Sequence, residues 1–425
     1  MPDVPRSPAA RFLILAVLAL VTPCAVRAQS TPESPATEAS ATEALGRIEG
    51  MSEQLQTLQS DVDKLKRFKF SGYVQARYEI GETSSDTVKS AGSPATLTLA
   101  NRDRFYLRRA RLKLTYDPTS RSHAVLYLNG ASTGNTLNIT LLEAYVSLLD
   151  PWTTDHRHQL WVGQMNVPFG WEVERSSSAR ELPERSRAEN VLFPGERDRG
   201  VKLVNPWTPH FETTLGVFNG GGTLDATFGT EDPTRAKDLV GRARFSQGRF
   251  DVAVSGYRGS TLVPLTGGDV ALDKTRFGAD AQAYWELPSA GGGSLRAEWY
   301  AGTQPNADSL KTLVVAPTSG NPVTLLRAGA DPSHLATEFH GGYVMWAQNL
   351  GDQAQLAARY EFFDPDDAVE HDQFERLSVG ANFFYDGTTR LTLAYDIPRT
   401  DLRNASGGYD DPSDNLWTFQ VQLRY

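Results

Sequence analysis

The feature that most constrains this chain is a strict alternation of apolar and polar residues, which recurs from residue 69 to the C-terminus. In the last segment Trp417, Phe419 and Val421 fall on one face, and polar residues fall on the other. A period of two indicates a strand with unlike faces. The pattern marks sixteen candidate strands of about ten residues, at 69–80, 103–117, 121–130, 139–149, 157–165, 197–205, 210–219, 237–246, 249–258, 274–286, 293–302, 336–349, 353–363, 373–386, 388–398 and 414–425.

The connections between these segments alternate between short and long. Short ones, such as 117–120, 246–249 and 386–387, carry the Pro, Gly and Asp residues of tight turns. The long ones are 81–102, 131–138, 166–196, 220–236, 259–273, 303–335, 364–372 and 399–413. Strands of this length and loops sorted in this way are typical of outer-membrane barrels, which have short periplasmic turns. The sequence therefore predicts an all-β fold, a sixteen-stranded antiparallel transmembrane β-barrel over residues 69–425.

The N-terminal residues predict three further segments. Residues 1–28 have the basic start, the apolar run and the small-residue cleavage site of a secretory signal peptide, and they contain the only cysteine, Cys24. Residues 29–43 are polar and predict a disordered spacer. Residues 44–67 predict a short periplasmic coiled-coil helix, because their apolar residues follow heptad spacing, namely Ala44, Ile48, Met51, Leu55, Leu58, Val62 and Leu65.

Charge and motifs exclude several classes of function. The formal net charge of −9 argues against nucleic acid as a partner. The sequence has no GxSxG, P-loop, HExxH or CxxC motif, so we expect no enzyme activity, no cofactor and no metal centre. The acidic stretch 364–372 is expected to be a solvated outer loop, with divalent cations that bridge lipopolysaccharide as an alternative.

Basic residues recur on the polar face of the predicted strands, which would line the lumen. Arg109, Arg111 and Lys113 occupy alternate positions of one strand and form a column of positive charge. Such a column could begin an anion track. Arg108 faces outward in a regular register, which hints at a bulge. The full set of predicted pore-lining basic residues is Arg77, Arg109, Arg111, Lys113, Lys202, Arg242, Arg244, Arg296, Arg359, Arg376 and Arg390. Inward acidic residues are nearly as numerous, so a lumen of balanced charge that merely stays hydrated remains an alternative.

The third long loop, 166–196, is too long and too charged for a simple turn. A sixteen-stranded barrel encloses an aqueous channel, and folding this loop inward would narrow it. Pro168 and Gly170 would end the strand and turn the chain. We therefore predict a constriction loop that presents both signs of charge near mid-depth, through Phe169, Glu172, Glu174, Arg175, Arg180, Glu181, Glu184, Arg185 and Arg187. An ordinary outer loop is the alternative.

The motif Gly163-Gln164…Val167-Pro168-Phe169-Gly170-Trp171-Glu172, followed by Ser176-Ser177-Ser178 and Pro183-Glu184-Arg185-Ser186, resembles the phosphate-selective porin O and P family. The basic strand 105–112 and the coiled coil before the barrel are similar to that family as well. The resemblance implies a homotrimeric outer-membrane channel for small anions such as phosphate. Asn166 stands where the family often has a lysine, which bears on phosphate specificity.

These observations together predict an outer-membrane porin, a passive diffusion channel for small hydrophilic solutes and in particular small anions such as phosphate. The expected partners are further copies of the chain in a homotrimer, outer-membrane lipid and lipopolysaccharide, and the barrel assembly machinery through the aromatic C-terminal strand. A general or weakly cation-selective porin that also tethers the outer membrane to the cell wall through its coiled coil is one alternative. A soluble glycan-binding β-protein is another.

Overall fold

The computed structural model describes residues 35–82, 84, 103–133, 136–222, 234–263, 270–305, 314–315, 325–326, 335–400, 402–403, 409–411 and 414–425. The predicted signal peptide 1–28 lies outside these residues. The chain forms two compact units, residues 1–65 and 66–425, and each is considered by itself. Among the described residues, no helix combines the length and the apolar character that a membrane span requires.

The first unit contains the helix α1, Pro35–Leu65. The helix begins nine residues before the predicted coiled coil, so residues 35–43 of the predicted spacer are helical instead. Three alanines and two glutamates among these nine residues favour the extension. Ile48, Leu55 and Leu58 lie on the helix with 60–64% of their surface exposed. Within the described part of this unit, residues 35–65, these heptad residues are therefore not covered by another element.

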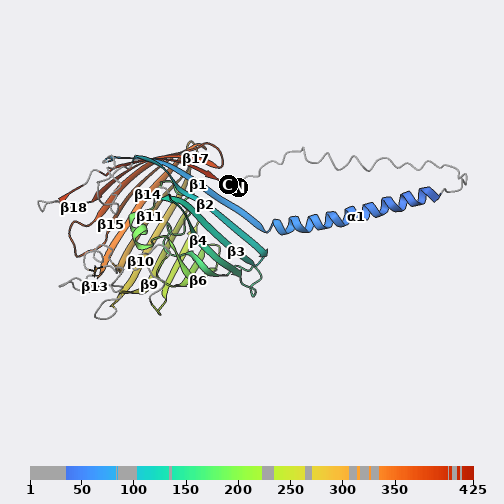
Figure 1. The fold of residues 1–425 in the computed structure, drawn as a ribbon. Coiled ribbons are helices and arrows are strands. Elements are labelled where there is room, and N and C mark those ends of the chain that lie inside the picture. The colour runs from blue at the N-terminus through green and yellow to red at the C-terminus, as the bar shows by residue number, and fades with distance from the viewer. Residues whose placement is uncertain are drawn as a thin grey trace, which may run out of the picture. The chain divides into compact units, whose positions relative to one another are not determined.

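The second unit is a closed antiparallel barrel of sixteen strands, in which neighbours in sequence pair and β1 pairs with β20 (Figure 1). This confirms the predicted fold class. The strands are β1 Phe68–Gly81, β2 Arg104–Thr119, β3 Ser122–Thr133, β4 Thr136–Leu149, β5 Gln159–Asn166, β6 Arg197–Pro206, β7 Phe211–Phe218, β8 Asp238–Gln247, β9 Phe250–Val263, β10 Val270–Leu287, β11 Gly291–Pro305, β14 Ala336–Leu350, β15 Ala354–Asp364, β16 Phe374–Phe384, β17 Thr389–Thr400 and β20 Leu416–Arg424.

Two pairs of very short strands lie in long connections, and the sequence pattern did not indicate them. They are β12 Val314–Val315 with β13 Leu325–Leu326, and β18 Leu402–Arg403 with β19 Tyr409–Asp410. Each pair forms its own two-stranded sheet apart from the barrel. Two residues are too few to show a period, so alternation carries no signal there.

The barrel strands expose their apolar residues and cover their polar ones. On β20, Phe419 and Leu423 are exposed, whereas Gln420 and Gln422 are buried. The same inversion of the usual soluble pattern holds along β9 and β10. An apolar outer belt with a polar interior is the arrangement that lipid requires of a barrel, because lipid solvates apolar side chains and offers no hydrogen bonds.

One bulge changes the facing of a basic residue. Gln75 of β1 pairs with Arg109 and Ala76 pairs with Leu107, so Arg108 is the extra residue of β2. The bulge turns the Arg108 guanidinium toward the interior, where it binds Glu184. The regular register that placed Arg108 outward was therefore wrong, and the irregularity suspected there is confirmed.

Candidate functional site: an inward loop and a basic vestibule

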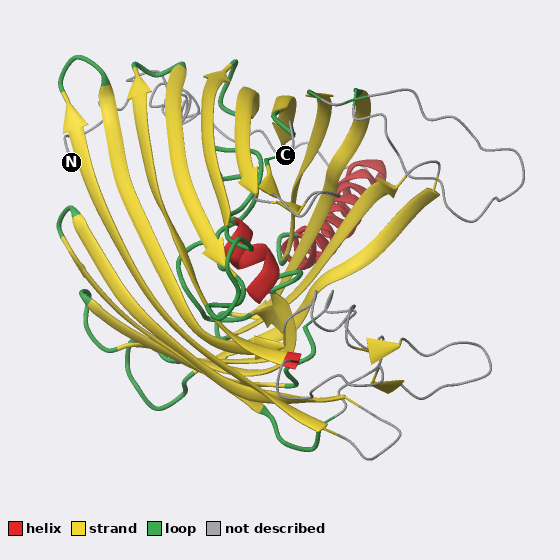
Figure 2. Ribbon diagram, turned by 90° about the vertical axis from the view of Figure 1, so that its left-hand side faces the viewer, coloured by secondary structure: helices red, strands yellow, loops and turns green. Residues whose placement is uncertain are grey.

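The constriction loop, residues 167–196, leaves the wall at the end of β5 and folds into the barrel (Figure 2). Its two ends are joined, since the Val167 amide donates to the Glu196 carbonyl at 3.1 Å. Gly170 then takes a φ of 62°, which favours glycine. Phe169 is fully buried and stacks on Tyr300 of the opposite wall, at 6.2 Å between ring centroids. The loop therefore folds inward, as the sequence predicts.

The loop contains a helix of six residues, α2 Arg187–Leu192, which Figure 2 shows within the ring of strands. Ser186 caps this helix by accepting a hydrogen bond from the Glu189 amide. Ala188 and Leu192 are buried in an apolar cluster with Phe169 and Phe193. Loop and wall therefore share one core inside the barrel.

Glu298 of β11 anchors the beginning of the loop. Its buried carboxylate accepts hydrogen bonds from the backbone amides of Trp171 and Glu172, at 2.9 and 2.8 Å. The hydroxyls of Tyr300 and Tyr343 donate to the same carboxylate, at 2.7 and 2.5 Å. Four donors converge on one side chain, which fixes the loop to the wall opposite β5.

Glu184 anchors the loop on another side. Its carboxylate accepts from Arg77 of β1 at 2.6 Å, from Arg108 of β2 at 2.7 Å and from Arg109 at 3.3 Å. Burial acts to raise the pKa of Glu184, but the three guanidinium groups outweigh it and hold this pKa well below its usual range. Because the bulge in β2 turns Arg108 inward beside Arg109, both arginines reach the Glu184 carboxylate.

A third set of contacts ties the loop to the remaining wall. Glu181 pairs with Arg296 of β11 at 2.8 Å, and its carbonyl accepts from Asn382 of β16 at 2.9 Å. The Arg185 carbonyl accepts from Arg359 of β15 and Arg376 of β16. The loop thus crosses the barrel and holds strands far apart in the ring.

Most charges of the loop are used within the structure and do not face an open channel. Glu172, Arg180, Glu181 and Arg185 are each at most 5% exposed. This corrects the expectation that they present charge to the lumen. Oppositely charged groups of the wall and the loop bind Glu172, Glu181 and Arg185, whereas the buried Arg180 guanidinium reaches only Glu196 within the described part of the chain, at 4.0 Å. Glu174, with 40% of its side chain exposed, remains accessible, and Arg187 rests on the Phe374 ring.

Glu196 gathers the basic groups at the base of the loop. Arg185 and Arg197 bind its carboxylate at 3.0 and 2.8 Å, and Arg180 lies 4.0 Å away. Burial acts to raise the pKa of Glu196, and these arginines overcome that effect and hold it at about 2. Glu196 is therefore ionised at every physiological pH and keeps the loop ends together.

The predicted pore-lining basic residues all occupy the inner face, but acidic partners neutralise most of them. Arg242 pairs with Asp280 at 2.7 Å, and Arg244 pairs with Asp251 at 2.7 Å. Arg77, Arg109, Lys202, Arg296, Arg359 and Arg376 pair in the same way with carboxylates of the loop or wall. For Arg111 and Arg390, no ion pair is found within the part of the chain that the structure describes.

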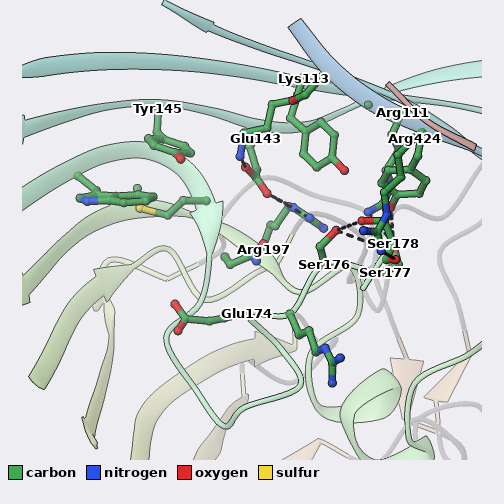
Figure 3. Close-up of a pocket in the computed structure, with 18 of the residues that line it drawn as sticks. Arg111, Lys113, Glu143, Tyr145, Glu174, Ser176, Ser177, Ser178, Arg197 and Arg424 are labelled. Atoms are coloured by element: carbon green, nitrogen blue, oxygen red, sulfur yellow. Dashed lines mark hydrogen bonds and ion pairs between the residues drawn. The ribbon is translucent and has the colours of Figure 1, made fainter. Parts of the chain in front are cut away.

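Basic residues gather around one cavity of about 460 Å³, which we call the vestibule (Figure 3). It lies between the loop and the wall formed by β20 and β1 to β6. Its lining residues lie toward the strand ends that the short turns connect, as Ser71 of β1 and Lys202 of β6 show. Two acidic residues, Glu143 and Glu174, face seven basic ones, which are Arg111, Lys113, Arg175, Arg185, Arg197, Lys202 and Arg424.

Aromatic rings support these basic side chains. The Arg111 guanidinium lies 5.6 Å from the ring centroids of both Tyr73 and Tyr127, and the Lys113 amine lies 5.4 Å from that of Tyr127. Lys202 lies over Trp161 at 4.7 Å. Cations over ring faces are stabilised electrostatically, which lets like charges gather on one wall.

Sequence reasoning found Arg111, Lys113 and Lys202 but missed Arg197, Glu143 and Glu298 as parts of the site. Arg197 begins β6 directly after the loop, so alternation gave no facing for it. Alternation places Glu143 and Glu298 on the inner face, yet nothing local distinguishes an anchoring carboxylate from a solvated one. Only the closed ring brings Glu298 to residues 171 and 172, more than a hundred positions earlier.

A closed sixteen-stranded barrel with a charged loop folded inside is the architecture of outer-membrane porins. The sequence model of the phosphate-selective porin O and P family matches residues 94–282, which confirms the resemblance expected from the loop motif. None of the curated proteins matches the chain. The fold is therefore that of outer-membrane porins, and residues 94–282 match a porin family model.

Solved structures with the same fold include three porins of low sequence identity. OmpT of Vibrio cholerae, in a trimer form, has a TM-score of 0.53 at 10% identity, covering 84% of this chain and 99% of that one. The anion-selective porin from Comamonas acidovorans has 0.52 at 13%, covering 84% and 98%. The outer membrane channel DcaP of Acinetobacter baumannii has 0.53 at 12%, covering 84% and 97%.

Proposed function

We propose that this porin is a passive channel that favours small anions, phosphate among them, and that the constriction loop and the vestibule give it this preference. The observation that carries the proposal is the charge of the vestibule, which seven basic and two acidic residues line. Five of the basic residues pair with carboxylates, whereas no ion pair is found for Arg111 and Arg424 among the described residues. A basic wall beside a constriction raises the local concentration of anions and so favours their passage.

In this proposal the three residues of the predicted column, Arg109, Arg111 and Lys113, have two different roles. Arg109 is held by Gln75 and Glu184, and it serves to anchor the loop. Arg111 and Lys113 line the vestibule, together with Arg424, and they attract the anion. Their substitution should therefore change selectivity, whereas substitution of Arg109 should loosen the loop.

The test is ion selectivity of the purified protein in a planar bilayer under a KCl gradient. We expect an anion-selective reversal potential, and we expect added phosphate to reduce the current. The variant Arg111→Gln/Lys113→Gln/Arg424→Gln should lose both effects while it still forms channels. Arg258→Gln removes an exposed charge on the outer face of β9 and serves as the matched control. Unchanged selectivity in the triple variant would contradict the proposal.

The exposed heptad residues of α1 support a second proposal, that three chains associate through their helices. A seam that is 45–69% exposed at Ile48, Met51, Leu55, Leu58, Val62 and Leu65 suits a partner helix of the same kind. OmpT of Vibrio cholerae is described in a trimer form, which agrees with this. The signal peptide, the periplasmic position of the helix, and the contacts with lipid, lipopolysaccharide and the assembly machinery belong to the same proposal.

Deletion of residues 29–67 separates this proposal from the tether. If the helix binds the cell wall, envelope attachment should fail in the deletion variant while conductance persists. If the helix serves association alone, attachment should be unchanged and the oligomeric mass should fall.

A further inference from the structure

The vestibule combines its basic groups with an aromatic wall, and this combination points to a narrower class of solute. Tyr145 and Trp161 stack with ring centroids 4.5 Å apart, and both line the cavity beside Met165. Figure 3 shows Tyr145 on the side of the cavity opposite Arg111 and Arg424, with Lys113 and Glu143 between them. Trp161 supports Lys202, whereas no cation of the described residues is found over the Tyr145 ring, so support of the basic side chains does not account for the whole aromatic pair.

The hydrogen-bonding groups of the vestibule are unbalanced in favour of donors. Glu143 accepts from Lys113 and Arg197, at 3.4 and 3.2 Å, and Glu174 accepts from Lys202 at 3.3 Å. Both carboxylates of the vestibule, the groups that could accept from the hydroxyls of a sugar, thus already accept hydrogen bonds from basic side chains. Arg111, by contrast, has no carboxylate partner among the described residues and donates to the Ser177 hydroxyl at 3.0 Å. The charge of the site that is not already paired is therefore cationic, and it lies in the same cavity as the Tyr145 and Trp161 rings.

We propose that the vestibule binds aromatic carboxylates, with the ring against the Tyr145–Trp161 wall and the carboxylate toward Lys113 and Arg111. The cavity of about 460 Å³ is within the usual size of a small-molecule site, roughly 300–1,000 Å³. An aromatic ring beside two others gains edge or face contacts, and a carboxylate gains charge-assisted hydrogen bonds from a guanidinium. This inference rests on the proposed anion channel and names its solute class.

The experiment measures block of the KCl current in a planar bilayer by two pairs of probes, benzoate against acetate and phthalate against succinate. Each pair has equal charge and differs in the ring. Aromatic contacts contribute about 0.5–1.5 kcal/mol, so the aromatic probe should block at a concentration about 2- to 10-fold lower. Block should be stronger from the side of the short turns, because the vestibule lies toward that end of the barrel.

Two variants assign the effect to its residues. Tyr145→Leu/Trp161→Leu should bring the two probes of each pair to equal potency. Lys113→Gln should weaken all four probes in similar proportion. Trp299→Leu removes an outer ring that is 44% exposed and is the matched control, which should keep the KCl conductance and the block of the wild type. Stable step currents in each variant report an intact barrel.

The outcomes distinguish this inference from the proposed function. Equal block by aromatic and aliphatic probes in the wild-type channel, with an anion-selective reversal potential, would overturn the solute class and leave the anion channel in place. A channel without anion selectivity would overturn the proposed function itself. Preferential block that survives in the Tyr145→Leu/Trp161→Leu variant would place the aromatic site elsewhere and so overturn the inference.

Discussion

Replacing Glu298 by alanine should release the beginning of the constriction loop. The carboxylate accepts two loop amides, from Trp171 and Glu172, at 2.9 and 2.8 Å. Each such bond contributes about 1–2 kcal/mol, so the loop should lose about 2–4 kcal/mol of anchoring free energy. That loss raises the population of the released loop by roughly 30- to 1,000-fold, since about 1.4 kcal/mol corresponds to a factor of ten.

Limited trypsin digestion measures this population, because the loop carries four arginines, Arg175, Arg180, Arg185 and Arg187. Cleavage within the loop, identified by mass spectrometry, follows the open population when opening is fast. Glu298→Gln keeps one carbonyl oxygen as acceptor and should give an intermediate rate. Glu338→Ala, an exposed carboxylate of β14, is the control. A Glu298→Ala rate within twofold of wild type would refute the anchoring argument.

Four further predictions concern the loop and the helix. Glu184→Gln should cost about 1–3 kcal/mol of loop anchoring, since the side chain is 28% exposed, and should raise open-channel noise. The lowered pKa of Glu184 gives stabilisation that is present above the unfolded value of about 4.3 and lost only as pH falls through the lower folded value, so wild-type noise should be the same at pH 5 and pH 7. Gly170→Ala should raise trypsin cleavage of the loop, because φ is 62° and a Cβ would lie 2.5 Å from a carboxylate oxygen, whereas Gly387→Ala, which meets nothing within 4 Å, should not. Leu55→Asp/Leu58→Asp should lower the oligomeric mass in sedimentation without changing the conductance of one barrel, and an unchanged mass would contradict helix association.

The fold could be predicted because lipid and water impose opposite demands on the two faces of each strand. The apolar Phe419 and the polar Gln420 each indicate, by their own side chain, which face of the strand they occupy. The number of strands and their approximate bounds therefore follow from the sequence alone. The start of α1 could not be placed, since residues 35–43 include alanines and glutamates that favour a helix but show no apolar period. The helix α2 was missed because six residues are too short to show a helical pattern.

The site could be predicted only in part, because its partners are distant in sequence. The inward path of the loop followed from its length, its charges and its Pro-Phe-Gly turn. The sequence did not show which charged residues pair with one another. Glu184 reaches Arg77 and Arg108 only when the barrel closes and the bulge in β2 turns Arg108 inward. Without these pairings, Arg109 and Arg111 look equivalent in sequence, although one anchors the loop and the other lines the vestibule.

The central claim is that the basic wall of the vestibule, with Arg111 and Arg424 outside any ion pair of the described residues, selects anions. The reversal potential of the wild-type channel under a KCl gradient tests this claim most directly. We predict a potential displaced toward the equilibrium potential of chloride, with the displacement reduced at high salt because screening weakens the basic field. A reversal at zero, or one displaced toward the potential of potassium, would contradict this account of the vestibule.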